Sequence, residues 1–183
     1  MNARHVILDR DGVLNREAPE HGYILAPADF HWLPGVLEAL ALMHGAGIRL
    51  SVASNQSAVG RGLMTRDQLE DIMAHMRVEA AAAGGPLAAV FYCPHAPDEG
   101  CDCRKPLPGL LTAAVRAAGI DAGETVLAGD DLRDVEAAEA AGVMAVLLRT
   151  GKGARAEIQL RKRGVTLPIY DNLLHFAREL TQT

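Results

Sequence analysis

The stretch His5-Val6-Ile7-Leu8-Asp9-Arg10-Asp11-Gly12 decides the fold class, because two carboxylates follow directly on a short apolar run. Alternate residues of an extended chain point the same way, so we expect Asp9 and Asp11 to stand together where a first strand ends. Gly12 lets the backbone turn sharply after them. Two close carboxylates repel each other unless a cation holds them, and Mg²⁺ binds one or two carboxylates together with waters and substrate phosphate. The stretch therefore predicts a strand that ends in a metal-dependent site, where one acid attacks and the other moves protons.

Strand-like and helix-like segments alternate along the rest of the chain. The expected strands cover residues 4–8, 48–53, 88–92, 125–128, 143–148 and 168–170. The expected helices cover residues 35–46, 65–83, 110–118, 132–141, 154–163 and 173–180. Such alternation predicts right-handed βαβ units around a parallel sheet, in a single domain over residues 1–183. An insert from Glu17 to Phe30, which contains His21, interrupts the alternation and is interpreted as either a flap over the site or a plain loop.

Polar side chains follow four of the expected strands. They are Asp9 and Asp11, Ser54 and Asn55, Arg104 and Lys105, and Asp130. Ligands of an open α/β sheet bind outside the carboxyl ends of its strands, so we expect these side chains to converge on one site. Acids and hydroxyls with structural roles alone would have no reason to recur at the same end of every strand.

At these residues the chain resembles a known family, the haloacid dehalogenase-type phosphatases, whose first motif is DxDGT or DxDGV. Within that family it is similar to the D-glycero-D-manno-heptose 1,7-bisphosphate phosphatases, which share DRDGVxN, a following NQSxxxRG stretch and a Cys/His loop that ends in CRKP. All three motifs occur here in that order, and the resemblance runs from about Arg4 to the C-terminus. It implies a Rossmann-like α/β fold, with a parallel sheet flanked by helices and no large cap domain.

The resemblance also implies roles for the acids. Asp9 would be the nucleophile that takes the phosphoryl group as an aspartyl-phosphate, and Asp11 the general acid/base, whose backbone carbonyl reaches Mg²⁺. Asp130 would complete the Mg²⁺ site with its carboxylate. Asp134 either joins that site through water or only favours the N-terminus of its helix, and Asp131 is expected to cap the helix.

Phosphate recognition needs hydrogen-bond donors and positive charge. Ser54 matches the family's hydroxyl motif, Asn55 adds donors, and Lys105 matches the lysine that balances charge on the transferring group. Turn chemistry would explain Ser54 and Asn55 taken alone, but their position after a strand favours a site. Arg104 is the candidate for the phosphate that stays on the sugar. Arg61 either shares that role or is a solvated loop residue.

The loop from Cys93 to Cys103 has the spacing of a metal site. It offers four soft or borderline ligands within eleven residues, as tetrahedral Zn²⁺ requires. The ligands would be Cys93, His95, Cys101 and Cys103. Four protein ligands leave no open position, so we expect a structural zinc that fixes the loop and positions the basic residues after it. A disulfide with a spare thiol is the alternative, and a reducing compartment disfavours it.

Composition narrows the remaining possibilities. The chain has 183 residues, of which 49% are hydrophobic, and a net charge of -5 without a long block of like charge. These values favour a substantial core and disfavour a nucleic-acid surface. No apolar run reaches transmembrane length, the N-terminus lacks a signal-peptide layout, and three clustered cysteines do not suit a secreted disulfide framework. We therefore expect a cytoplasmic monomer that binds a small sugar bisphosphate and no membrane.

The combined prediction is an Mg²⁺-dependent phosphatase that removes the C7 phosphate of heptose 1,7-bisphosphate, in the route to nucleotide-activated heptose. One alternative is a histidinol-phosphate phosphatase, whose Cys/His loop has the same short spacing. Asn15 and the stretch from Asn55 to Gly62 favour the heptose enzyme. A second alternative is a non-catalytic, zinc-stabilised binding module on the same fold. It is disfavoured because the acids and the lysine expected to do the chemistry are all present.

Overall fold

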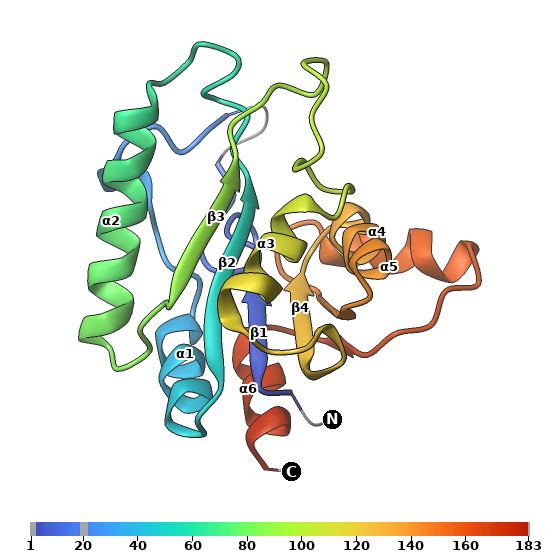
Figure 1. The fold of residues 1–183 in the computed structure, drawn as a ribbon. Helices are drawn as coiled ribbons and strands as arrows, with labels where there is room; N and C mark the ends of the chain where they lie inside the picture. The colour runs from blue at the N-terminus through green and yellow to red at the C-terminus, as the bar shows by residue number, and fades with distance from the viewer. Residues whose placement is uncertain (1–2, 19–21, 183) are drawn as a thin grey trace.

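In the computed structural model of the chain, which describes residues 3–18 and 22–182, six parallel strands form one sheet in the order β3-β2-β1-β4-β5-β6. Figure 1 labels the first four strands of this order, from β3 to β4. The strands are β1 His5–Leu8, β2 Arg49–Asn55, β3 Ala89–Cys93, β4 Thr125–Gly129, β5 Met144–Leu148 and β6 Ile169–Tyr170. The chain adds β2 and β3 on one side of β1 and β4 to β6 on the other. β1 therefore lies next to the point where the strand order reverses, which is where open α/β sheets bind ligands.

Helices cover both faces of this sheet. They are α1 Val36–Gly45, α2 Arg66–Ala82, α3 Gly109–Ala118, α4 Leu132–Ala141, α5 Gly153–Lys162 and α6 Leu173–Thr181, with short 3-10 turns η1 Pro27–Asp29 and η2 Ala122–Glu124. Buried residues of α1, α2 and α6 share one hydrophobic cluster, those of α3 and α4 a second, and α5 packs on β5. The predicted fold class is confirmed, and every predicted strand and helix is present with ends that differ by at most two residues.

β1 lies between the two cores. Val6 and Leu8 belong to the cluster with α1, α2 and α6, whereas Ile7 belongs to the cluster with α3 and α4. Successive side chains of a strand point to opposite faces, so a strand covered on both sides must be apolar throughout. This explains why the run before Asp9 does not alternate, and it fixes the strand that Asp9 and Asp11 follow.

α2 begins as its sequence predicts. The Thr65 hydroxyl accepts a hydrogen bond from the Gln68 backbone N–H at 3.1 Å, and the Thr65 N–H donates to the Gln68 side chain at 2.8 Å. Such a cap stabilises a helix by about 1 kcal/mol. The helix then buries one face against the sheet, through Leu69, Ile72, Met73, Met76 and Ala80.

The insert between β1 and α1 is closed at its base by backbone pairing. The Arg16 N–H donates to His31 O at 2.9 Å and the Leu33 N–H donates to Leu14 O at 2.9 Å. His21 lies outside the described residues. Within the part of the chain that the structure describes, no helix combines the length and the apolar character needed to span a membrane.

Candidate active site

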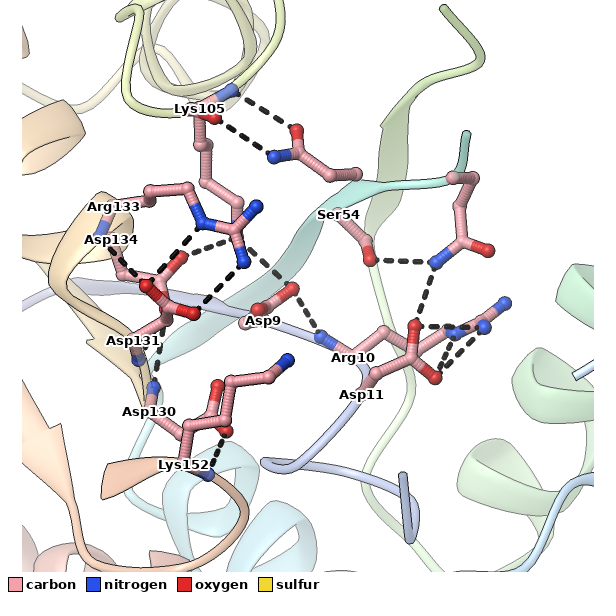
Figure 2. Close-up of polar contacts among 12 residues, drawn as sticks. Asp9, Arg10, Asp11, Ser54, Lys105, Asp130, Asp131, Arg133, Asp134 and Lys152 are labelled. Carbon is pink, nitrogen blue, oxygen red and sulfur yellow. Dashed lines mark hydrogen bonds and ion pairs between the residues drawn. The ribbon is translucent and has the colours of Figure 1, made fainter. Parts of the chain in front are cut away.

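Three carboxylates meet at the carboxyl edge of the sheet (Figure 2). Asp9 follows β1, Asp130 follows β4, and Asp134 lies in the first turn of α4, with oxygens that all lie within 4.8 Å of one another. Asp130 and Asp134 are buried, and Asp9 is partly buried. Oxygen donors at this spacing suit a hard cation such as Mg²⁺. We call these three residues the carboxylate group.

The backbone around Asp130 holds its carboxylate in one place. The Lys152 N–H donates to Asp130 Oδ2 at 2.8 Å. Gly12 and Gly151 both have positive φ, and a Cβ atom at either position would overlap Asp130 Oδ2. Two glycines in left-handed conformations therefore allow the loops after β1 and β5 to close around this acid.

Burial and mutual repulsion make two acids of this group, Asp9 and Asp130, hard to ionise. Burial raises the pKa of Asp9 to about 6, although the Lys105 ammonium opposes the shift. Burial, with the charges of Asp9 and Asp134, raises the pKa of Asp130 well above its ordinary value. Acids that repel each other in this way are relieved by a bound cation.

Lys105 supplies positive charge from inside the site. It is 2% exposed, and its Nζ lies 3.0 Å from Asp9 Oδ1 and 2.6 Å from Asp134 Oδ1. The Asn55 side chain fixes its backbone, donating to Lys105 O at 2.9 Å and accepting from the Lys105 N–H at 3.0 Å. The sequence predicts that Asn55 offers backbone or amide donors to phosphate. In the structure both polar atoms of its amide bond to Lys105, so the side chain positions the lysine.

The carboxylate of Asp11 lies apart from the carboxylate group. Its oxygens accept hydrogen bonds from Arg10 Nη2 at 2.9 Å, from Asn15 Nδ2 at 2.9 Å and from Gln56 Nε2 at 2.9 Å. Burial acts to raise the pKa of Asp11, but the Arg10 guanidinium and these donors bring it below its ordinary value. Asp9 and Asp11 thus follow the same strand, as expected, but each carboxylate has its own counter-charge.

The start of α4 shows the contacts of Asp131, which the sequence predicted as a helix cap, and of Asp134, for which it left two roles open. Asp131 caps the helix, accepting from the Arg133 N–H at 3.1 Å, as predicted. Asp134 Oδ2 accepts from the Asp130 and Asp131 N–H groups at 3.2 and 3.0 Å. Its other oxygen faces Lys105, so Asp134 stabilises the helix N-terminus and also belongs to the carboxylate group.

A cleft of about 730 Å³ opens above these residues. Ser54 lines it, together with Arg61 and Arg104 on one side and Tyr23 and Ile24 from the described part of the insert. The insert therefore borders the site, as the flap interpretation requires. The volume of the cleft is ample for a small ligand with two phosphates.

Five basic or amide residues that line this cleft received no role from the sequence. They are Arg10, Gln56, Arg133, Lys152 and Arg155. One signal was available for Lys152, since it lies in the loop that follows a fifth parallel strand and such loops border the ligand site. Arg10 and Gln56 are part of the DRDGVxN and NQSxxxRG motifs, which gave them a signal, but the sequence assigned neither of them a role.

The Cys/His loop brings its four ligand atoms within 4.8 Å of one another. His95 Nδ1 lies 3.4 Å from the sulfurs of Cys93 and Cys103, and the Cys93 and Cys101 sulfurs are 3.7 Å apart. A tetrahedral zinc with Zn–S near 2.3 Å separates its ligand atoms by about 3.6–3.8 Å, so the spacing suits it. All three thiols are free, so the structure contains no disulfide at this loop.

The Cys/His loop also supports the part of the cleft that Arg61 and Arg104 line. Cys93 O accepts a hydrogen bond from the Gln56 N–H at 2.7 Å, and Pro94 O accepts one from the Gly60 N–H at 2.8 Å. Arg104 Nη1 donates to His95 O at 3.3 Å. Both candidate arginines are thereby attached to the loop, Arg61 through its neighbour Gly60 and Arg104 directly.

Comparison with known proteins identifies similar chains over nearly the whole length. Residues 102–176 match the HAD-hydrolase-like family. The D-glycero-beta-D-manno-heptose-1,7-bisphosphate 7-phosphatase of Pseudomonas putida is 42% identical over 177 residues, which are 96% of this chain and 98% of the relative. The enzyme of the same name from Pseudomonas aeruginosa is 38% identical over 182 residues, with 100% of both chains covered. The crystal structure of D,D-heptose 1.7-bisphosphate phosphatase from B. bronchiseptica, complexed with magnesium and phosphate, has a TM-score of 0.90 and 36% identity, covering 98% of each chain.

Proposed function

Because this chain belongs to the family of the D-glycero-beta-D-manno-heptose-1,7-bisphosphate 7-phosphatases, we propose that it hydrolyses the 7-phosphate of heptose 1,7-bisphosphate and leaves the phosphate on C1. The single observation that carries this proposal is the cleft, in which the carboxylate group and two arginines face the same space. The relatives are named for a heptose substrate, so the histidinol-phosphate alternative is not supported. Their names specify the β anomer, which makes that anomer the first to assay.

We propose that Asp9 and Asp11 carry the chemistry. Asp9 Oδ1 accepts from the Arg10 N–H at 2.7 Å and pairs with Lys105, which leaves Oδ2 to attack phosphorus. The bond from phosphorus to the sugar oxygen breaks, and Asp11 gives that oxygen a proton. Asp11 then takes a proton from the water that attacks the aspartyl-phosphate, which releases inorganic phosphate and restores Asp9.

The carboxylate group, with the backbone carbonyl of Asp11, is proposed to hold Mg²⁺. The donors fit the ion, since they are oxygens, closely spaced and already crowded enough to raise the pKa values of two of the acids. When bound, Mg²⁺ would neutralise phosphoryl charge and orient the group for in-line attack. The magnesium and phosphate in the B. bronchiseptica structure support this assignment.

The remaining polar residues are proposed to divide between the two phosphates. Ser54 and Lys105 would contact the transferring phosphoryl group, because they border the carboxylate group. Arg104, with Arg61, would hold the phosphate that is retained. A planar guanidinium suits this task, since it can form two parallel hydrogen bonds to a phosphate.

The Cys/His loop is proposed to hold a structural zinc through Cys93, His95, Cys101 and Cys103. Burial and the neighbouring thiols raise the pKa of Cys103 to about 12, so zinc binding would have to displace the proton of this thiol. Zinc would then fix the loop to which the two arginines are attached. The described residues of one chain include every acid and base that the reaction needs, and we propose that the enzyme acts as a cytoplasmic monomer.

Substitution of Arg104 tests the substrate assignment. Arg104→Ala deletes a charge-assisted contact worth about 1.5–3 kcal/mol. We expect kcat/KM for heptose 1,7-bisphosphate to fall by about ten-fold to a hundred-fold, with little change for heptose 7-phosphate. The matched control is Arg155→Ala, which removes the same charge from the α5 side of the cleft and should affect the two substrates alike. An equal loss on both substrates in Arg104→Ala would place this residue on the transferring phosphoryl group and contradict the proposal.

A further inference from the structure

Gln56 lies between two parts of the site that the reaction uses together. It is 5% exposed and follows directly on β2. Its Nε2 donates to Asp11 Oδ2 at 2.9 Å and to Ser54 Oγ at 2.9 Å. Figure 2 labels the two side chains that accept these bonds. One primary amide thus uses both of its hydrogens, one toward the acid/base and one toward the phosphate side.

The bond to Ser54 fixes what the serine hydroxyl can do. A hydroxyl has one hydrogen to donate and two lone pairs that accept. Ser54 Oγ accepts from Gln56, so its own hydrogen must point elsewhere, and Ser54 lines the cleft. The hydroxyl is thereby prepared as a donor, which is the form that binds a phosphoryl oxygen.

The hydrogen bond from Gln56 to Asp11 differs from the others at that carboxylate in how far apart its partners lie in the sequence. Arg10 and Asn15 also donate to it, but they are one and four residues away and move with the same loop. Gln56 is 45 residues away and directly follows another strand, β2. Among residues 3–18 and 22–182, it provides the one hydrogen bond that ties the Asp11 carboxylate to a different segment of the fold.

Gln56 is itself held firmly. Its backbone N–H donates to Cys93 O at 2.7 Å, at the end of β3. The amide therefore projects from a point that two neighbouring strands define. A side chain on a strand end places its polar group more reproducibly than one on a free loop, because the sheet limits backbone motion.

We propose that Gln56 is a positioning residue that places the Asp11 carboxylate at a fixed point relative to Ser54, and hence relative to the leaving oxygen of the phosphate that Ser54 binds. The inference rests on the proposed phosphatase mechanism, in which Asp11 protonates the leaving oxygen. It adds a residue to that mechanism whose effect depends on the leaving group. A sugar alkoxide departs only with a proton, whereas p-nitrophenolate departs without one.

The test compares leaving groups in Gln56→Met, which keeps the side chain's size and removes both donors. We expect kcat for heptose 1,7-bisphosphate to fall by about ten-fold to a hundred-fold while KM changes little. The first step with p-nitrophenyl phosphate, measured as the burst of p-nitrophenol in rapid-mixing experiments, should change by less than about three-fold, on the same reasoning. Gln56→Asn keeps an amide on a shorter side chain and should recover part of the lost kcat.

Ser54→Ala is the matched control, because it removes a phosphate donor and should slow both substrates alike. Equal losses on both substrates in Gln56→Met would mean that Gln56 acts through Ser54 or the fold, and would overturn the proposal, as would an unchanged kcat. Melting temperatures and Mg²⁺ affinities of the variants should equal those of the wild type. If the proposed substrate is wrong, the wild-type enzyme itself will fail to hydrolyse heptose 1,7-bisphosphate. The wild type and Gln56→Met could then be compared with any alkyl phosphate that the enzyme cleaves.

Discussion

The carboxylate group and the Cys/His loop each gather metal-ligating atoms within 4.8 Å, but they are built in opposite ways. The carboxylate group combines residues from β1, β4 and α4, and an internal ammonium and backbone N–H groups hold it in place. The Cys/His loop draws its ligands from eleven consecutive residues. The first is a site that the fold makes, and the second is a loop that the proposed zinc would hold in its folded form.

Charge sharpens this contrast. Three carboxylates and the ammonium of Lys105 leave two negative charges, which a divalent cation balances. While the metal is absent, Lys105 reduces the repulsion among these carboxylates, because its buried ammonium pairs with Asp9 and Asp134. The Cys/His loop has no such internal cation among its ligands. Loss of metal should therefore stop chemistry at the first site and loosen structure at the second.

Asp9→Asn should give the largest effect. The substitution removes the nucleophile and nearly preserves its shape, so turnover should fall by about 10⁴-fold or more. Folding should persist, since the group loses one of three mutually repelling charges. Steady-state kinetics and thermal melting measure the two outcomes. Appreciable residual turnover would defeat the aspartyl-phosphate mechanism and, with it, the view of this group as the chemical centre.

Cys101→Ser should act on structure first. Loss of one zinc ligand removes folding free energy from the loop, and a loss of about 2 kcal/mol would lower Tm by roughly 4–8 °C in a domain of this size. Mg²⁺ affinity, measured by titration calorimetry, should be nearly unchanged. Elemental analysis that found no zinc in wild-type protein purified without chelators would contradict the assignment of this loop.

Stability of the metal-free protein should depend on pH through Asp9. Its pKa is about 6 in the folded protein against 3.8 as the ordinary value, so the folded state holds the proton more tightly. The resulting stabilisation is complete below pH 3.8 and is lost as pH rises through about 6. When excess Mg²⁺ is added to protein that a chelator has freed of metal, Tm should thus rise more at pH 7 than at pH 5. The difference should shrink in Asp9→Asn, and equal rises in the wild type would contradict the coupling.

The same contrast explains what the sequence could predict. The four ligands of the Cys/His loop could be predicted because they are neighbours in the chain. Asp9 and Asp130 could be predicted because each follows an apolar strand. The contact of Gln56 with Asp11 spans 45 residues, and it depends on how two strand ends face each other. For the same reason, the residue type of Asn55 revealed its polar groups, but only the packed structure shows that its amide bonds to the backbone of Lys105.

The enclosure of Asp130 by Gly12 and Gly151 has a consequence for engineering. Any side chain at either position would displace the carboxylate, so these positions are closed to diversification, although both lie beside the cleft and would be obvious choices in a mutant library. A search for new substrates should instead vary Tyr23 or Arg155, which line the cleft on different segments. The reaction centre and the specificity surface can then be changed independently.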